Sequence, residues 1–300
     1  MEEAPPATTK PSLVRRFVRY PLIQAFVGAV MVLGALATVS AVNNFIGPRV
    51  TVGRVAATVI ELTAAIVGAL AVIGAWKLYK RWIEREPDLE FASRGAVPEL
   101  AAGLASGLVL FSLVTGVVWL LSGIRFEGVR ALGDTQFTQW ATLAIISGFL
   151  EETLFRGLLF RAIEKVSGSW IALAVTSAFF GAAHIFNPDA TWFAAVAIAV
   201  EAGILLGAAY MLTRRLWLAV GMHAAWNFTQ GWVFSIPVSG TGQPIGLIRT
   251  TRAGPEWLTG GEFGLEASAI AMLIVTAFGL ALLAWVARRG GFVAPLWRRG

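Results

Sequence analysis

The feature that most constrains the fold is a succession of eight apolar segments, each long enough in helical form to cross a bilayer. They cover residues 21–43, 55–76, 97–123, 137–163, 169–186, 191–213, 216–236 and 265–287. A spanning helix needs about 20 predominantly apolar residues. Backbone polar groups in lipid must be satisfied within the protein, which at this hydropathy only helices achieve. The sequence therefore predicts an all-α fold, a polytopic bundle of about eight transmembrane helices.

The composition indicates one membrane domain. Hydrophobic residues make up 57% of the chain and charged residues 14%, against about a quarter charged in a soluble domain. We expect a transmembrane domain over 20–290, with a core over 137–236 that carries the polar motifs described below. A disordered cytoplasmic tail is expected over 1–19 and a short cytoplasmic tail over 291–300. A cleaved signal peptide is the alternative at the N-terminus, but the first apolar run is too long for an ordinary one.

The basic residues are interpreted as topology signals and not as a nucleic-acid surface. The net charge is +6 and the isoelectric point is near 10.3. With both termini on the inside, most of the 24 lysines and arginines fall in the two tails and in the loops of that same side, such as 77–96. This bias predicts cytoplasmic termini. We expect an integral protein of a bacterial plasma membrane, in contact with the lipid bilayer and without a nucleic-acid partner.

Two carboxylates and a guanidinium interrupt the fourth apolar segment. Ionisable groups at bilayer depth are costly and usually functional. Glu152 and Arg156 are four residues apart and share a helix face, where they can neutralise each other. Glu151 is rotated by about 100° from Glu152 and has no such partner. An unpaired carboxyl in an apolar setting suits a general base or acid, so Glu151 is the candidate catalytic group.

The only two histidines of the chain lie in later apolar segments, each with a companion one helical turn away. His184 follows Phe180, and His223 precedes Asn227. We predict that Phe180 packs against the His184 ring. An imidazole and a carboxamide can both donate hydrogen bonds to a developing oxyanion, which is the role expected of His223 and Asn227. Cysteine is absent, which excludes disulfides, thiolate metal sites and a cysteine nucleophile.

Two further acids, Glu61 and Glu201, lie in the second and sixth apolar segments and raise a proton-coupled transporter as an alternative. The chain has no internal repeat and no matched pair of broken helices, which disfavours a transporter. Glu201 is expected instead to form a hydrogen bond with a neighbouring helix. A non-catalytic membrane scaffold or immunity protein is a third possibility, against which the intact polar motifs argue.

The three motifs together resemble the CPBP intramembrane protease family. Glu151-Glu152-x-x-x-Arg156, Phe180-x-x-x-His184 and His223-x-x-x-Asn227 occur in the order of that family and on separate predicted helices. The family includes the type 2 CAAX prenyl proteases, or Ras-converting enzymes, and bacterial proteins related to bacteriocin self-immunity. The resemblance covers residues 137–236 and implies an intramembrane endopeptidase whose three motif helices converge on one polar cavity.

The resemblance also implies a role for each motif residue. Glu151 would be the catalytic carboxylate and His184 its partner in activating a water, while His223 and Asn227 would hold the oxyanion. Glu152 and Arg156 would be a supporting pair. Zinc is a possible cofactor, with Glu151, His184 and His223 as ligands. We favour a metal-free mechanism, because Asn227 beside His223 suits an oxyanion hole. The expected substrate is a peptide or membrane protein that enters laterally.

Overall fold

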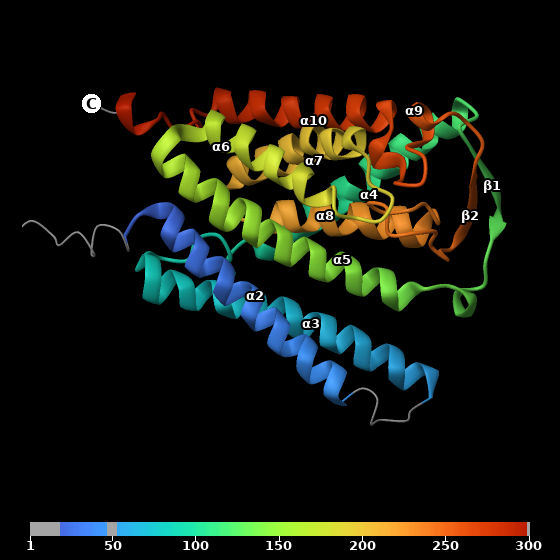
Figure 1. The fold of residues 1–300 in the computed structure, drawn as a ribbon, viewed down its shortest axis with the longest axis horizontal. Helices are drawn as coiled ribbons and strands as arrows, with labels where there is room; N and C mark the ends of the chain where they lie inside the picture. Colours follow the sequence, from blue (N-terminus) through green and yellow to red (C-terminus); the bar gives the residue numbers. More distant parts are fainter. Residues whose placement is uncertain (1–18, 47–52, 299–300) are drawn as a thin grey trace, which may run out of the picture.

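The computed structural model describes residues 19–46 and 53–298. The predicted N-terminal tail therefore lies outside the described residues, apart from Arg19. The main helices are α2 (Pro21–Ile46), α3 (Arg54–Tyr79), α4 (Ala96–Leu120), α5 (Phe137–Glu152), α6 (Arg161–His184), α7 (Trp192–Thr213), α8 (Trp217–Phe228) and α10 (Ala269–Arg288). The prediction of an all-α polytopic bundle is confirmed (Figure 1).

Several shorter elements connect these helices. Three π-helices, η2 (Lys80–Glu84), η4 (Thr153–Phe160) and η5 (Thr229–Val233), continue α3, α5 and α8. A short α9 (Glu256–Thr259) and the 3₁₀ turns η3 (Leu132–Asp134), η6 (Leu265–Ala267) and η7 (Leu296–Arg298) lie in the loops and near the C-terminus. Two strands, β1 (Ile124–Val129) and β2 (Ile248–Arg252), are the only strands in the described ranges.

Within the described residues, six helical segments are long and apolar enough to cross a membrane, against the eight predicted. The difference has two causes. First, two of the predicted segments fall within the 48 residues 137–184, which count as one segment although the helix is broken and reverses direction at Gly168 (Figure 1). Gly168 has φ 78° and ψ 171°, a backbone conformation that glycine adopts most easily. Second, α8 has only 12 residues and is continued by 5 residues of η5.

The helices pack around α8. Helix α8 contacts α4 on one side and α5 on another, while α7 lies between α6 and α10. Helices α2 and α3 form a hairpin that packs against α5. The start of α2 and the end of α10 lie at the same end of the bundle, as an even number of crossings requires (Figure 1).

Glycines allow the closest helix approaches in this bundle. A Cβ on Gly221 of α8 would lie 2.6 Å from the carbonyl oxygen of Leu100 on α4. A Cβ on Gly148 of α5 would lie 3.1 Å from the carbonyl oxygen of Val220 on α8. Because these distances leave no room for a side chain, helices α4 and α5 approach α8 backbone to backbone.

The antiparallel pair β1–β2 closes the bundle at the end opposite the termini (Figure 1). A bulge between Phe126 and Gly128 shifts its register. The sequence does not predict this pair. Each strand has only five or six residues and finds its partner more than a hundred positions away, so no local pattern announces the pairing.

A buried ionic cluster joins the hairpin to α6 at the end where α3 stops. Arg161 binds Glu84 through Nη2 at 2.8 Å and Glu90 through Nε at 2.8 Å. Lys80 joins the same cluster, because its Nζ lies 2.7 Å from Oε2 of Glu84. Lys80 and Arg161 are 2% and 8% exposed, so both cations are buried with their counter-charges. The connection after α3 is therefore fixed to the start of α6.

Candidate active site

Glu152 is the buried centre of the polar motifs. Its Oε1 accepts one hydrogen bond from Arg156 Nη1 at 2.9 Å and another from His223 Nδ1 at 2.8 Å. The first contact confirms that Glu152 and Arg156 share a helix face. Arg156 also donates through Nη2 to the carbonyl oxygen of Ala202 on α7, at 3.2 Å. Glu152 is fully buried, so this carboxylate joins α5 to α8 and, through Arg156, to α7.

The π-helix η4 begins directly after Glu152. A π-turn holds one more residue than an α-turn, and such turns occur frequently at functional sites. The hydroxyl of Thr153 donates to the carbonyl oxygen of Phe149 at 2.6 Å, which occupies an acceptor where the two helix types meet. Arg156 lies in the first turn of η4, and its guanidinium remains within hydrogen-bond distance of the Glu152 carboxylate. Apolar periodicity does not distinguish a π-turn from an α-turn, and the sequence did not indicate it.

Glu151 points away from the bundle interior. Its side chain is 28% exposed, and its Oε2 has no hydrogen-bond partner among the described residues. Nε2 of His223 lies 3.9 Å from Oε2 of Glu151. The imidazole of His223 therefore lies between two carboxylates, bonded to Glu152 through Nδ1 and facing Glu151 through Nε2.

His184 is held by its own helix. Its Nδ1 lies 2.7 Å from the carbonyl oxygen of Phe180. Because a carbonyl oxygen only accepts, Nδ1 carries the proton, and Nε2 of the neutral ring keeps its lone pair. The ring centroid of Phe180 lies 4.9 Å from that of His184, which confirms the predicted packing. The ring of Phe180 also lies near two other motif residues. Its centroid is 6.0 Å from that of the His223 ring and 4.5 Å from the central carbon of the Arg156 guanidinium.

Asn227 completes the motif residues. Its Nδ2 donates to the hydroxyl of Ser147 on α5 at 3.0 Å, and the residue is 8% exposed. Asn227 and His223 lie one turn apart on α8 and line the same cavity, as their spacing predicts. A carboxamide that donates to a hydroxyl can exchange that partner for a stronger acceptor, such as an oxyanion.

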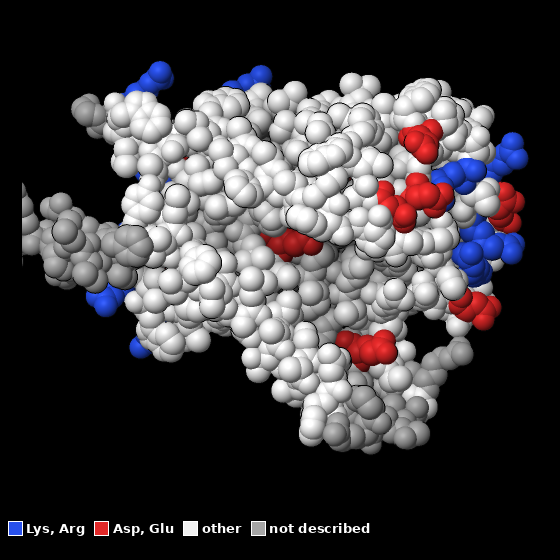
Figure 2. Space-filling view, viewed as in Figure 1, with Lys and Arg blue, Asp and Glu red and all other residues white. Residues whose placement is uncertain are grey.

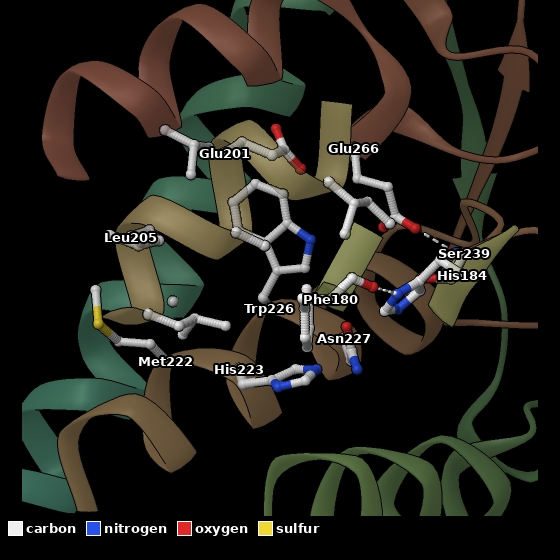
Figure 3. Close-up of a pocket in the computed structure, with 15 residues that line it drawn as sticks. Phe180, His184, Glu201, Leu205, Met222, His223, Trp226, Asn227, Ser239 and Glu266 are labelled. Atoms are coloured by element: carbon white, nitrogen blue, oxygen red, sulfur yellow. Dashed lines mark hydrogen bonds between the residues drawn. The ribbon is translucent and has the colours of Figure 1, made fainter. Parts of the chain in front are cut away.

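These side chains line two separate spaces. An inner cavity of about 50 Å³ is lined by His184, His223 and Asn227 (Figure 3). An outer groove of about 750 Å³ runs between α2, α3 and α5 and is lined by Glu151 and Ser147. Figure 2 shows an acidic side chain inside a hollow in the middle of a face whose charged side chains lie mainly towards its two ends.

The expectation that all four candidate catalytic residues face one cavity is therefore wrong for Glu151. The inner cavity takes His184, His223 and Asn227, whereas Glu151 faces the outer groove. The reason is helical geometry. Glu152 points inward, so a neighbour rotated by about 100° points towards the α2–α3 hairpin. Glu151 reaches the other residues only through the 3.9 Å approach to His223.

The comparison with protein families decides the relationship. Residues 133–229 match the family described as type II CAAX prenyl endopeptidase Rce1-like. Over these residues, about a third of its length, the chain is similar to this family. The matched region holds all three Rce1-like motifs, on α5 with η4, on α6 and on α8. The matched family is one of proteases, and the match together with the six apolar segments supports an integral membrane protein. Comparisons with curated proteins and with solved structures gave no match.

The possible zinc site of this Rce1-like chain was tested against the arrangement of its donor atoms. Across residues 19–46 and 53–298, no three His, Asp or Glu side chains are placed to hold one ion. The hydrogen bonds at Nδ1 leave Nε2 of both His184 and His223 available to a metal, but Glu151 lines a different space from His184. The three proposed ligands therefore do not fit zinc as they stand, and no catalytic step is assigned to a metal.

Sequence reasoning missed two residues of the site. Ser147, which binds Asn227, gave no signal, because a serine in an apolar helix is common. Glu266 lies on η6 and lines the inner cavity, but its segment lacks a motif. Glu201 was correctly placed beside the site, yet it makes no hydrogen bond to any described residue, so its predicted bond to a neighbouring helix is wrong. Glu61 lines the outer groove.

Proposed function

We propose that this Rce1-like protein hydrolyses a peptide bond of a membrane-associated peptide or protein, using a water activated by Glu151 and His184. One observation carries the assignment of the base. Oε2 lacks a hydrogen-bond partner among the described residues in both glutamates, but Glu152 is fully buried with Oε1 bonded to Arg156 and His223, whereas Glu151 lines the outer groove 3.9 Å from His223. A base must have a free lone pair to take a proton.

The neighbouring carboxylate has a different task. Glu152 fixes the ring of His223, because its hydrogen bond at Nδ1 defines the tautomer and the ring plane. Arg156 compensates its charge. The two hydrogen bonds from Arg156 and His223 favour the charged form of the Glu152 carboxylate. We therefore assign Glu152 and Arg156 to positioning and not to proton transfer.

The proposed steps follow from these roles. Because Glu151 and His184 line different spaces in this structure, the proposal requires substrate binding to bring both to one water. Glu151 then takes a proton from that water, which His184 Nε2 helps to orient, and the water oxygen adds to the peptide carbonyl carbon. The resulting oxyanion accepts from Asn227 Nδ2, which releases Ser147, and from His223 Nε2 when that ring is protonated. The carbon–nitrogen bond then breaks, and the leaving amine takes the proton from Glu151. Hydrogen bonds that are long without substrate commonly shorten when it binds.

The outer groove is the proposed route of entry. It is open, it leads to Glu151, and it combines apolar residues such as Leu36 and Ile146 with polar ones such as Asn43 and Gln139. An extended peptide presents both kinds of group. A substrate tethered in the bilayer can reach this groove from the side. We further propose a bacterial plasma membrane with both termini in the cytoplasm, and no nucleic-acid partner.

The experiment is cleavage of a peptide library by the full-length protein in lipid nanodiscs. Wild-type protein is compared with Glu151→Gln at equal amounts of folded material, and products are identified by mass spectrometry. Site-specific cleavage that disappears in Glu151→Gln supports the proposal. Absence of any product, or equal cleavage by both proteins, contradicts it.

A further inference from the structure

The inner cavity has an acidic wall that the proposed reaction does not use. Glu201 on α7 and Glu266 on η6 line it, at 2% and 3% exposure (Figure 3). No lysine or arginine is among the residues that line this cavity. Two neighbouring buried acids without a cation are unusual, because buried charges are normally paired.

Glu201 has the stronger need for a partner. Its Oε2 is buried and forms no hydrogen bond with any described residue. Glu266 is partly satisfied, because the backbone N–H of Ser239 donates to its Oε1. Burial nevertheless raises the pKa of Glu266 to about 7. A buried polar atom without a hydrogen-bond partner costs free energy. A ligand that donates a hydrogen bond to Oε2 of Glu201 would remove this cost, which favours its binding.

The dimensions of the cavity limit that ligand. A water needs about 10–15 Å³ of such space, so about 50 Å³ admits only a few non-hydrogen atoms. That is the end of one side chain and is too small for a prenyl tail. The remaining lining is apolar, with Ile198, Leu205 and Leu206. An aliphatic stem that ends in a cationic or strongly donating group matches both parts of this lining.

The position of the cavity relates the ligand to the reaction. His184, His223 and Asn227 line the opposite side from Glu201 (Figure 3). A side chain that occupies the cavity must therefore belong to a residue beside the bond that these groups would act on. An acidic residue in a pocket next to a scissile bond selects a basic side chain.

We propose that Glu201 and Glu266 form the end of a specificity pocket that receives a lysine or arginine side chain of the substrate, next to the scissile bond. This inference rests on the proposed peptidase function. It makes Glu201 and Glu266 specificity-determining residues that contact the substrate side chain and take no part in bond cleavage.

The test is a set of matched peptides that carry lysine, arginine, norleucine or glutamate on either side of the cleaved bond. We expect wild-type kcat/KM to favour lysine or arginine over norleucine by about 10-fold or more, because a polar pocket left unpaired rejects an apolar analogue. In Glu201→Gln with Glu266→Gln the preference should fall to within about threefold. Cleavage of the norleucine peptide should persist in that double variant.

The matched control is Glu262→Gln. Glu262 lies four residues before Glu266, and its side chain is 72% exposed on the surface. This variant should keep the wild-type preference. Thermal unfolding of each variant establishes that equal amounts of folded protein are compared. Equal cleavage of all four peptides by wild type, or an unchanged preference in the double variant, overturns the inference.

A second readout separates the pocket from the protease proposal. n-Butylammonium, with 1-butanol as the uncharged control, is titrated against thermal unfolding of the full-length protein. We expect saturable stabilisation of wild type by the ammonium, lost in the double variant and kept in Glu262→Gln. If wild type cleaves no peptide, the peptidase proposal fails and this titration alone decides the pocket. Absence of ammonium-specific stabilisation then overturns it, and stabilisation that depends on the two acids supports it.

Discussion

Nδ1 of His223 donates to Oε1 of Glu152 at 2.8 Å, between residues that are 71 positions apart in the chain. The bond fixes the α8 imidazole against α5 and leaves its other nitrogen facing Glu151. Two adjacent glutamates thus have different environments: Glu152 is fully buried and bonded through Oε1, and Glu151 has a side chain that is 28% exposed and lines the outer groove. Their substitutions should have opposite consequences.

Glu151→Gln should lower peptide cleavage by about 10²–10⁴-fold without loss of folded protein. The amide cannot take a proton from water, whereas its size matches the acid that it replaces. The measurement is the initial rate of cleavage, with thermal unfolding in detergent as the test of folding. A rate near that of wild type would remove Glu151 from the role of base.

Glu152→Gln and Arg156→Ala should instead reduce stability. Each leaves the other member of a buried ion pair uncompensated, at a cost of about 3–5 kcal/mol. The free energy of unfolding in mixed micelles measures the effect. Arg252→Ala is the control, because it breaks the exposed Arg252–Glu262 pair and should cost less than about 1 kcal/mol. Equal losses in Arg156→Ala and Arg252→Ala would show that the buried pair is not needed for stability.

Chelation tests the metal-free mechanism. Because Glu151 and His184 line different spaces and no described set of three donors fits an ion, exhaustive treatment with a strong chelator should leave the cleavage rate unchanged. Elemental analysis of the purified protein accompanies the assay. One zinc per chain, with activity lost on chelation and restored by added zinc, would make the metal-free proposal untenable.

Glu266 predicts a pH dependence of stability. Burial raises its pKa from 4.5 to about 7, so between these values the folded protein holds a proton that the unfolded chain has released. Stability should therefore be highest below pH 4.5 and fall as pH rises to about 7, by roughly 3 kcal/mol from this group. The groups that face it are Ser239, Gln230, Trp226 and Glu201.

The measurement is the difference in unfolding free energy between wild type and Glu266→Gln at several pH values. The difference should vary over this window and be constant above it. A constant difference across the window would mean that Glu266 titrates normally. Comparing the two proteins cancels the contributions of the other titrating groups.

Helix α4 offers a pair of matched glycines for testing its approach to α8. A Cβ on Gly103 would lie 3.0 Å from the Cα of Gly221 and closer still to the carbonyl oxygen of Leu218, whereas a Cβ on Gly116 would meet nothing within 4 Å. Gly103→Ala should cost about 1–3 kcal/mol through overpacking. Gly116→Ala should be neutral or stabilising by about 0.5–1 kcal/mol. Unfolding in detergent measures both, and effects of the same sign would contradict the packing described.

The sequence predicts what depends on near neighbours. Apolar runs placed the main helices to within a few residues, and the four-residue spacing predicted both the Glu152–Arg156 pair and the Phe180–His184 contact. The pairing of β1 with β2 could not be predicted, because its register depends on segments more than a hundred positions apart.

The same limit applies to the site. That Glu266 lies beside Glu201 depends on how η6 meets α7, which no local pattern encodes. The direction of Glu151 follows from helical rotation only after it is known that Glu152 faces inward, and that in turn depends on His223 of α8. The motifs therefore predict which residues form the site, but not which space each side chain faces.

The ionic cluster around Arg161 has a mechanical consequence for the outer groove. It anchors the α2–α3 hairpin where α3 stops, and the groove lies towards the opposite end, between residues such as Asn43, Glu61 and Gln139. There the hairpin diverges from α5 (Figure 1). Because the hairpin is held at the end of α3, its displacement should be largest at the opposite end, near the groove. Any swing of the hairpin thus widens the mouth of the groove first and leaves the geometry around Glu152 nearly unchanged.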